Sequence, residues 1–287
     1  MSQPKLDPQF SDYVVDNPSL SYVQPDDSRL RKFIINSLEL MMGREKLELV
    51  YRELKNKPFD IETFFGDAIE TGKLNVNHRG ILPSEINVDG PLIFLANHPY
   101  GIVDGMVLCD IAARIRGDFR ILLHSILCQD IDLAPYFLPV DFNETKAAMK
   151  TNIRTKQLAL DALTKDVPLL LFPSGMVSTA KKFGFGSVED APWTTFAAKL
   201  VKQSKATVVP IYFHGRNSRK FHVASHIAES LRTGLLMHEA INKFGNRVDV
   251  AIGEPIAWST LEQYDHRQAL TDALYNSVQA LKFKSTT

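Results

Sequence analysis

Residues 92–105, LIFLANHPYGIVDG, carry the clearest structural signal in the sequence. They open with an apolar run at 92–96, and a continuous apolar run of this length is typical of a strand buried on both faces of a sheet. Asn97, His98 and Pro99 follow, and the proline disfavours helical angles at the histidine. We therefore predict a fixed turn that carries His98 between a buried strand and a helix over about 102–115.

The rest of the chain repeats this alternation of strand and helix. Four further apolar runs predict buried strands, and they lie at 119–124, 167–172, 207–213 and 247–253. Helical patterns follow or separate them at about 143–164, 192–204, 224–243 and 265–282. Such alternation predicts an α/β fold, with a mixed, partly parallel sheet flanked by helices.

The N-terminal part has a different pattern. Residues 1–27 are polar and contain prolines, which predicts an extended segment. Apolar residues recur at helical spacing over 28–56, with Gly43 as a break, and a further helix is expected over 59–72. We predict a helical N-terminal extension at 1–80 and an α/β domain at 81–287.

Composition restricts the class of protein. The 33 basic residues equal the 33 acidic ones, and there is no basic tract, which argues against nucleic acid as the main partner. Cys109 and Cys128 form no disulfide framework, which favours a reducing cytosol. We find no signal-peptide pattern and no apolar run near the ~18 residues of a membrane-spanning helix.

Polar, turn-forming residues follow three of the five apolar runs. They are NHPYGIVD at 97–104, FPSGMVS at 172–178 and HGRNS at 214–218. Ligands of open α/β sheets bind at the carboxyl ends of the strands. We therefore expect these three turns to meet at one edge of the sheet.

The first turn has the groups needed for acid–base chemistry. With a bend at 99–101, Asp104 at the start of the next helix can face His98. A carboxylate that holds one imidazole nitrogen leaves the other free to take a proton from a hydroxyl or amine. The alternative is a hydrogen-bonded loop histidine beside an ordinary helix-start acid.

The other two turns offer binding groups. Backbone amides near Ser174 and Gly175 can bind an anion or an oxyanion, although Pro-Ser-Gly is also an ordinary turn. Arg216, beside Asn217, suits a phosphate or carboxylate, or else caps a carbonyl at the surface. His222 and His226 have the spacing of a zinc pair, but without HExxH or paired cysteines we predict no metal site.

Taken together, these motifs resemble the glycerolipid acyltransferase superfamily, which includes the lysophosphatidic acid acyltransferases. The likeness is closer to its bacterial hemolysin-like branch, which includes the O-acyltransferases of ornithine- and glycine-lipid synthesis. The motifs that carry the resemblance are NHPYGIVDG, FPSGMVS, Asp190-Ala191-Pro192-Trp193 and VPIYFHGRNS, and the likeness covers roughly residues 85–258. Five residues rather than four separate His98 from Asp104, as in the closer branch. Ser174 replaces a glutamate associated with acceptor binding in the wider family, so the resemblance does not extend to a glycerol-phosphate acceptor.

The resemblance implies transfer of a fatty acyl group from an acyl-ACP or acyl-CoA thioester to a hydroxyl or amine of a lipid precursor such as a lysolipid. His98 would be the general base and Asp104 its orienting partner. Asn97, Ser174, Gly175, Arg216 and Asn217 would contact substrate, with no bound cofactor. Two other hypotheses stay open, a serine esterase using Ser174 and a non-catalytic lipid-binding protein.

A lipid acceptor without a spanning helix predicts a cytoplasmic enzyme that is peripheral at the inner face of the membrane. The amphipathic stretch at 28–42 is the expected contact, or alternatively a helix that only caps the sheet.

Overall fold

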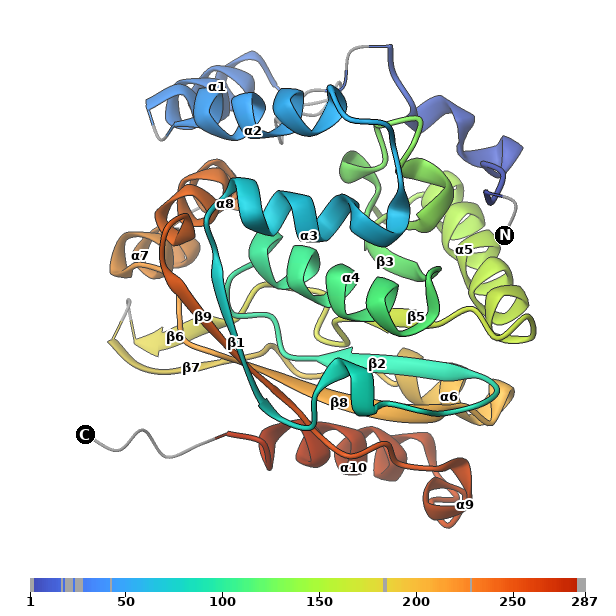
Figure 1. Ribbon diagram of the computed structural model, residues 1–287. Helices are drawn as coiled ribbons and strands as arrows, with labels where there is room; N and C mark the ends of the chain where they lie inside the picture. Colours follow the sequence, from blue (N-terminus) through green and yellow to red (C-terminus); the bar gives the residue numbers. More distant parts are fainter. Residues whose placement is uncertain are drawn as a thin grey trace.

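The computed structural model describes residues 3–16, 18, 23, 28–41, 43–182, 185–227 and 229–282. Within these residues, seven strands form one sheet in the order β1-β9-β8-β2-β5-β3-β4, and β6 and β7 form a separate hairpin (Figure 1). The strand bounds are β1 Asn75–Gly80, β2 Leu92–Ala96, β3 Arg120–His124, β4 Phe137–Val140, β5 Leu169–Leu171, β6 Thr179–Lys182, β7 Phe185–Glu189, β8 Thr207–His214 and β9 Arg247–Ile252.

Helices precede the sheet and connect its strands. Their bounds are α1 Arg29–Met41, α2 Arg44–Lys55, α3 Ile61–Thr71, α4 Ile102–Arg116, α5 Lys146–Leu163, α6 Phe196–Ser204, α7 Arg219–Ile227, α8 Glu229–Lys243, α9 Trp258–Leu261 and α10 Arg267–Gln279. Short 3-10 helices lie at Pro8–Tyr13, Pro83–Glu85, Ser125–Leu127 and Ala134–Tyr136.

Five neighbouring strands of the large sheet run in the same direction. The pairs β8–β2, β2–β5, β5–β3 and β3–β4 are all parallel, whereas β9 is antiparallel to β8 and pairs in parallel with β1. The predicted α/β fold with a mixed, mostly parallel sheet is therefore confirmed. The carboxyl ends of β2, β5 and β8, where the three polar turns begin, lie at the same edge.

Helices cover both faces of the sheet, which explains the apolar runs. Leu92, Phe94 and Ala96 of β2 pack into one core with α3 and α4. Ile93 and Leu95 of the same strand pack into a second core with α5, α6 and α10. Figure 1 shows this layering, with α3 and α4 on one side of the sheet and α10 on the other. Alternate residues of a strand point to opposite faces, so a strand between two helical layers must be apolar throughout.

The N-terminal helices confirm the break expected at Gly43. Gly43 has φ +93°, a left-handed angle that suits glycine, and α2 begins at the next residue. The extended segment expected at 1–27 is only partly described, and its described part contains the 3-10 helix Pro8–Tyr13. This helix is docked, because Phe10 is buried and Asp7 pairs with Arg154 of α5 at 2.6 Å.

Several elements differ from the sequence-based expectations. β1 lies inside the stretch expected to be helical, yet it pairs with β9 from Asn75 to Gly80. One residue at its start and two at its end are exposed around a half-buried centre, so it lacks the apolar run that marks the central strands. β4 and the β6–β7 hairpin were also missed, and the single helix expected at 224–243 is two helices, α7 and α8.

Candidate active site

His98 and Asp104 face each other across the turn that follows β2. Nδ1 of His98 lies 3.0 Å from Oδ2 of Asp104, an ion-pair distance outside the angular limits of a hydrogen bond. Asp104 is fully buried, whereas the His98 side chain keeps 18% of its surface exposed. Phe172, at the end of β5, stacks on the imidazole with ring centres 4.0 Å apart. The ring is thus held on two sides and is open to solvent on part of its surface.

Asp104 is fixed by its position in the first turn of α4. Its Oδ2 accepts backbone N–H bonds from Tyr100 (2.8 Å) and Gly101 (2.9 Å). Gly101 has φ +87° where the chain turns into the helix, an angle that L side chains rarely adopt. Burial raises the pKa of Asp104, and His98 together with the two N–H donors opposes that rise. A carboxylate held in this way can orient an imidazole and stabilise its protonated form.

The backbone of His98 is held as firmly as its ring. Its N–H donates to Oδ1 of Asp190 (3.2 Å), and its carbonyl accepts from the N–H of Ser178 (2.8 Å). Asp190 was quoted in the sequence only as part of a motif, and no role was predicted for it. Ser178 follows the FPSG turn, so the first and second polar turns are directly connected.

Asn97 joins the first turn to β8. Its Nδ2 donates to the carbonyl of Phe213 (3.0 Å), and its Oδ1 accepts from the N–H of the same residue (2.7 Å). The side chain is 5% exposed. Both ends of the carboxamide are therefore engaged by the backbone of β8, and the contact of Asn97 with substrate stays a prediction.

In the Pro-Ser-Gly turn, one backbone amide and the serine hydroxyl form hydrogen bonds within the turn. The Gly175 N–H donates to the carbonyl of Phe172 (2.9 Å), so this amide is already engaged. Ser174 is 7% exposed, and its hydroxyl donates to the carbonyl of Met176 (2.9 Å). A nucleophilic serine needs a hydrogen bond to its base, and Ser174 instead stabilises its own turn. This geometry counts against the esterase hypothesis.

The third turn contacts the first one through Tyr100. The Tyr100 hydroxyl donates to the carbonyl of His214, and Nδ2 of Asn217 donates to the carbonyl of Tyr100 (3.4 Å). Gly215 has φ +132°, and a Cβ built there would lie 1.7 Å from the Tyr100 hydroxyl, so only glycine fits. Asn217 is 2% exposed, and its Oδ1 is buried without a hydrogen-bond partner.

Arg216 is exposed, in contrast to Asn217 beside it. Its guanidinium lies 3.4 Å from the carbonyl of Gly186 in the β6–β7 hairpin. Lys243 of α8, which sequence reasoning missed, donates to the Arg216 carbonyl (3.1 Å) and lies 4.5 Å from the centre of the Tyr100 ring. Burial lowers the pKa of Lys243, and Glu239 and Asp104 oppose that effect. Lys243 thus brings a cationic side chain to Tyr100 of the first turn, whereas the Arg216 side chain contacts the hairpin.

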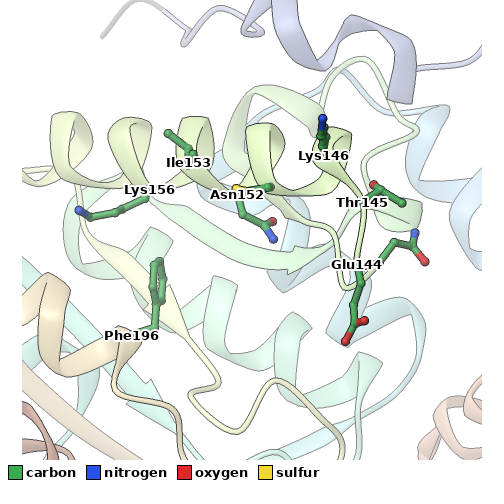
Figure 2. A pocket seen from close by; sticks show the side chains of 9 residues that line it. Glu144, Thr145, Lys146, Asn152, Ile153, Lys156 and Phe196 are labelled. Carbon is green, nitrogen blue, oxygen red and sulfur yellow. The ribbon is translucent and has the colours of Figure 1, made fainter.

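A pocket of about 550 Å³ opens between α5 and α6 (Figure 2). Apolar, polar and charged side chains line it, and they are Asn143, Glu144, Thr145, Lys146, Met149, Asn152, Ile153, Lys156 and Phe196. Its neighbours connect it to the Pro-Ser-Gly turn. Thr194, close before α6, donates its N–H to the Pro173 carbonyl (3.3 Å), and Phe142, next to the pocket, faces Gly175.

Among the residues that the structure describes, no group of three His, Cys, Asp or Glu side chains has the arrangement of a metal site. Nδ1 of His222 accepts from the Ala180 N–H (3.3 Å), and Nε2 of His226 lies 2.7 Å from the Ala180 carbonyl, so both rings contact the hairpin. Among the same residues, no helix combines the length and the apolar character needed to cross a membrane.

Several known proteins are similar to this chain. The chain is 28% identical over 242 residues to a lyso-glycine lipid O-acyltransferase of Bacteroides thetaiotaomicron, covering 81% of this chain and 84% of that protein. It is 25% identical over 243 residues to a protein of the same name from Phocaeicola vulgatus, covering 81% of each chain. The structure of the 1-acyl-sn-glycerophosphate acyltransferase PlsC from Thermotoga maritima aligns with a TM-score of 0.47 and 16% identity, over 88% of this chain and 89% of that one.

A family model described as "Acyltransferase" matches residues 28–272, a span that includes the N-terminal helices as well as all three polar turns. The match extends over far more than half of the chain. On this evidence the protein is an enzyme that belongs to the acyltransferase family.

Proposed function

We propose that this acyltransferase moves a fatty acyl group from a thioester to the hydroxyl of a lysolipid, with His98 as general base. The observation that carries the proposal is the partly exposed His98 ring, held by the buried Asp104 at 3.0 Å. A base needs a fixed orientation and access to the proton it removes, and this histidine has both.

The chemistry follows from that arrangement. The imidazole nitrogen opposite Asp104 takes the proton of the acceptor hydroxyl while the oxygen attacks the thioester carbonyl. The tetrahedral intermediate then collapses, the C–S bond breaks, and the leaving thiolate takes up the proton. Asp104 stabilises the imidazolium between these two steps. A second, covalent acyl-enzyme step is not needed, which agrees with the engaged hydroxyl of Ser174.

A lyso-glycine lipid is the acceptor that we propose. The names of two relatives that cover 81% of this chain support it. The headgroup of such a lipid carries a carboxylate, and Lys243 beside the Tyr100 ring, with Arg216 on the third turn, supplies positive charge. Acyl-ACP or acyl-CoA is the proposed donor, and the pocket between α5 and α6, with Lys146 and Lys156 at its wall, is the proposed site for its phosphate-bearing arm.

We further propose that α1 places the enzyme on the inner face of the cytoplasmic membrane. Leu30 and Phe33, three residues apart on one helical face, are 69% and 70% exposed. Exposed apolar side chains on an amphipathic helix are suited to the headgroup region of a bilayer.

An acceptor assay tests the proposal. Purified protein is mixed with a labelled palmitoyl thioester, on either coenzyme A or acyl carrier protein, and with lyso-glycine lipid or lysophosphatidic acid dispersed in detergent. We expect a diacylated glycine lipid and little diacylated phosphate lipid, and the two donor arms identify the carrier. Release of free fatty acid with no lipid product would contradict the proposal.

A further inference from the structure

We propose that Asp190 is a positioning residue for His98, an inference that rests on the proposed function. The carboxylate lies directly after β7 and is 92 positions from His98 along the chain. Its Oδ1 accepts from the His98 N–H (3.2 Å) and from the Ser178 hydroxyl (2.5 Å). Asp190 therefore binds the backbone of the proposed base and not a surface partner.

Asp190 completes a closed ring of contacts around the His98 peptide. Ser178, held by Asp190 through its hydroxyl, donates its own N–H to the His98 carbonyl (2.8 Å). The N–H and the carbonyl of His98 are therefore both held by the Asp190 carboxylate, the N–H directly and the carbonyl through Ser178. Ser178 is 2% exposed, so water competes little for these bonds.

The other oxygen of Asp190 is anchored in the core. Its Oδ2 accepts from the indole N–H of Trp193 (3.0 Å). Trp193 is buried and packs edge-on against Tyr275 of α10, with ring centres 5.4 Å apart. Asp190 therefore links the His98 turn to a helix on the opposite face of the sheet, which keeps the carboxylate from following local movement of the turn.

The backbone N–H groups of the turn donate to two different carboxylates. Asp190 accepts from His98, Asp104 accepts from Tyr100 and Gly101, and Pro99 has no N–H to offer. Asp104 thus fixes the orientation of the imidazole and the start of α4. Asp190 fixes the backbone at the point where the turn leaves β2. Without Asp190 the His98 N–H would be left unpaired in a largely buried site, and the turn would shift to find another acceptor.

The test compares two variants at Asp190 with a matched control elsewhere. Asp190→Ala removes the acceptor, and Asp190→Asn keeps one oxygen that can still accept from His98. Asp130→Ala is the control, because Asp130 is likewise a loop carboxylate with several hydrogen bonds, but it is buried and its partners include Tyr51 and Lys55 of α2. All three are assayed for kcat and KM with lyso-glycine lipid and a palmitoyl thioester, well below their melting temperatures.

We expect Asp190→Ala to lower kcat by about 100-fold, the scale of a base displaced by roughly 1 Å, with both KM values little changed. Asp190→Asn should recover part of that loss, because its amide oxygen can accept from His98 while its amide nitrogen then lies opposite the Trp193 N–H. Asp130→Ala should keep kcat although it lowers the melting temperature. Equal kcat in Asp190→Ala and Asp130→Ala, or a loss only in KM, would overturn the inference. A His98→Ala protein that stays active would instead overturn the proposed function, so the two failures can be told apart.

Discussion

At the scale of single residues, the candidate site depends on a buried carboxylate beside a partly exposed imidazole. Asp104 occupies the first turn of α4, where the helix dipole and two backbone N–H groups hold its charge. The 3.0 Å contact with His98 is therefore set by the start of the helix, before any substrate binds. This residue-level order is what makes general-base chemistry reasonable at this turn.

Ser174 gives the first prediction. Its hydroxyl donates to the Met176 carbonyl inside the Pro-Ser-Gly turn, so it is not directed to a base. We expect Ser174→Ala to keep measurable acyl transfer, and we expect the wild-type protein to resist labelling by fluorophosphonates. Intact-mass spectrometry after incubation with a thioester donor alone checks for an acyl-enzyme. A covalent adduct that disappears in the alanine variant would favour the esterase hypothesis.

Much of this residue-level arrangement could be predicted from sequence. The Asn-His-Pro turn after an apolar run indicated a histidine at a strand end, and the bend at 99–101 allowed Asp104 to face it. Asn97 and Gly175 were harder, because a motif does not say which backbone group its atoms contact. Asp190 and Lys243 reach the turn only through tertiary contacts, and no local pattern signals such contacts.

At the scale of elements, α7 holds the β6–β7 hairpin through two histidines at Ala180. His222 is fully buried and must be neutral to accept the Ala180 N–H at Nδ1. Burial, and after it the positive charge of Arg216, lowers the pKa of His222 to about 4. The unfolded chain binds this proton near its ordinary pKa of about 6.5. Protonation therefore favours the unfolded state as the pH falls from about 6.5 to about 4.

This gives a prediction about stability. In His222→Asn the amide oxygen can replace Nδ1 as the acceptor, but it does not titrate. We expect the variant to be less stable than wild type at neutral pH, because ring packing is lost. We also expect its free energy of unfolding to fall less than that of wild type between about pH 6.5 and about pH 4.

Urea unfolding at several pH values measures the difference, with His226→Asn as a control at the more exposed histidine. The prediction fails if wild type and His222→Asn lose the same free energy over this pH window.

The N-terminal helices give a prediction about the membrane. Replacing Leu30 and Phe33 with serine removes the most exposed apolar side chains of α1 without disturbing a buried contact. We expect this double variant to cosediment less with anionic phospholipid vesicles than wild type, because less apolar surface is available for insertion. Leu49→Ser on α2, at 58% exposure, is the matched control. Unchanged cosedimentation of the double variant would mean that α1 is only a structural helix.

The strands show which elements a sequence can and cannot reveal. The central strands of the sheet lie between two helical layers, so the sequence shows them as continuous apolar runs. These strands are β2, β5 and β8. β1 at the edge and the β6–β7 hairpin outside the sheet are largely exposed or half-buried, and they carry no such run. The extension predicted to be helical at 1–80 therefore contains a strand that was not expected, β1, which pairs with β9 at the edge of the sheet.

At the scale of the whole molecule, five parallel strands bring three distant segments to one edge. The turns at 97–104, 172–178 and 214–218 are joined by Phe172 on His98, Ser178 on the His98 carbonyl and Asn217 on the Tyr100 carbonyl. The fold class and the meeting of these turns could be predicted, because a parallel sheet places its strand ends together. Their mutual hydrogen bonds could not, since they depend on side-chain packing.

The most direct measurement is the turnover of labelled palmitoyl thioester and lyso-glycine lipid to the diacylated product by wild type and by His98→Ala. The ring is partly exposed, so its loss should leave the fold intact, which circular dichroism and the melting temperature check. The account predicts a fall in kcat of about 100-fold or more, because the acceptor hydroxyl loses its base. A folded His98→Ala protein with wild-type turnover would contradict it.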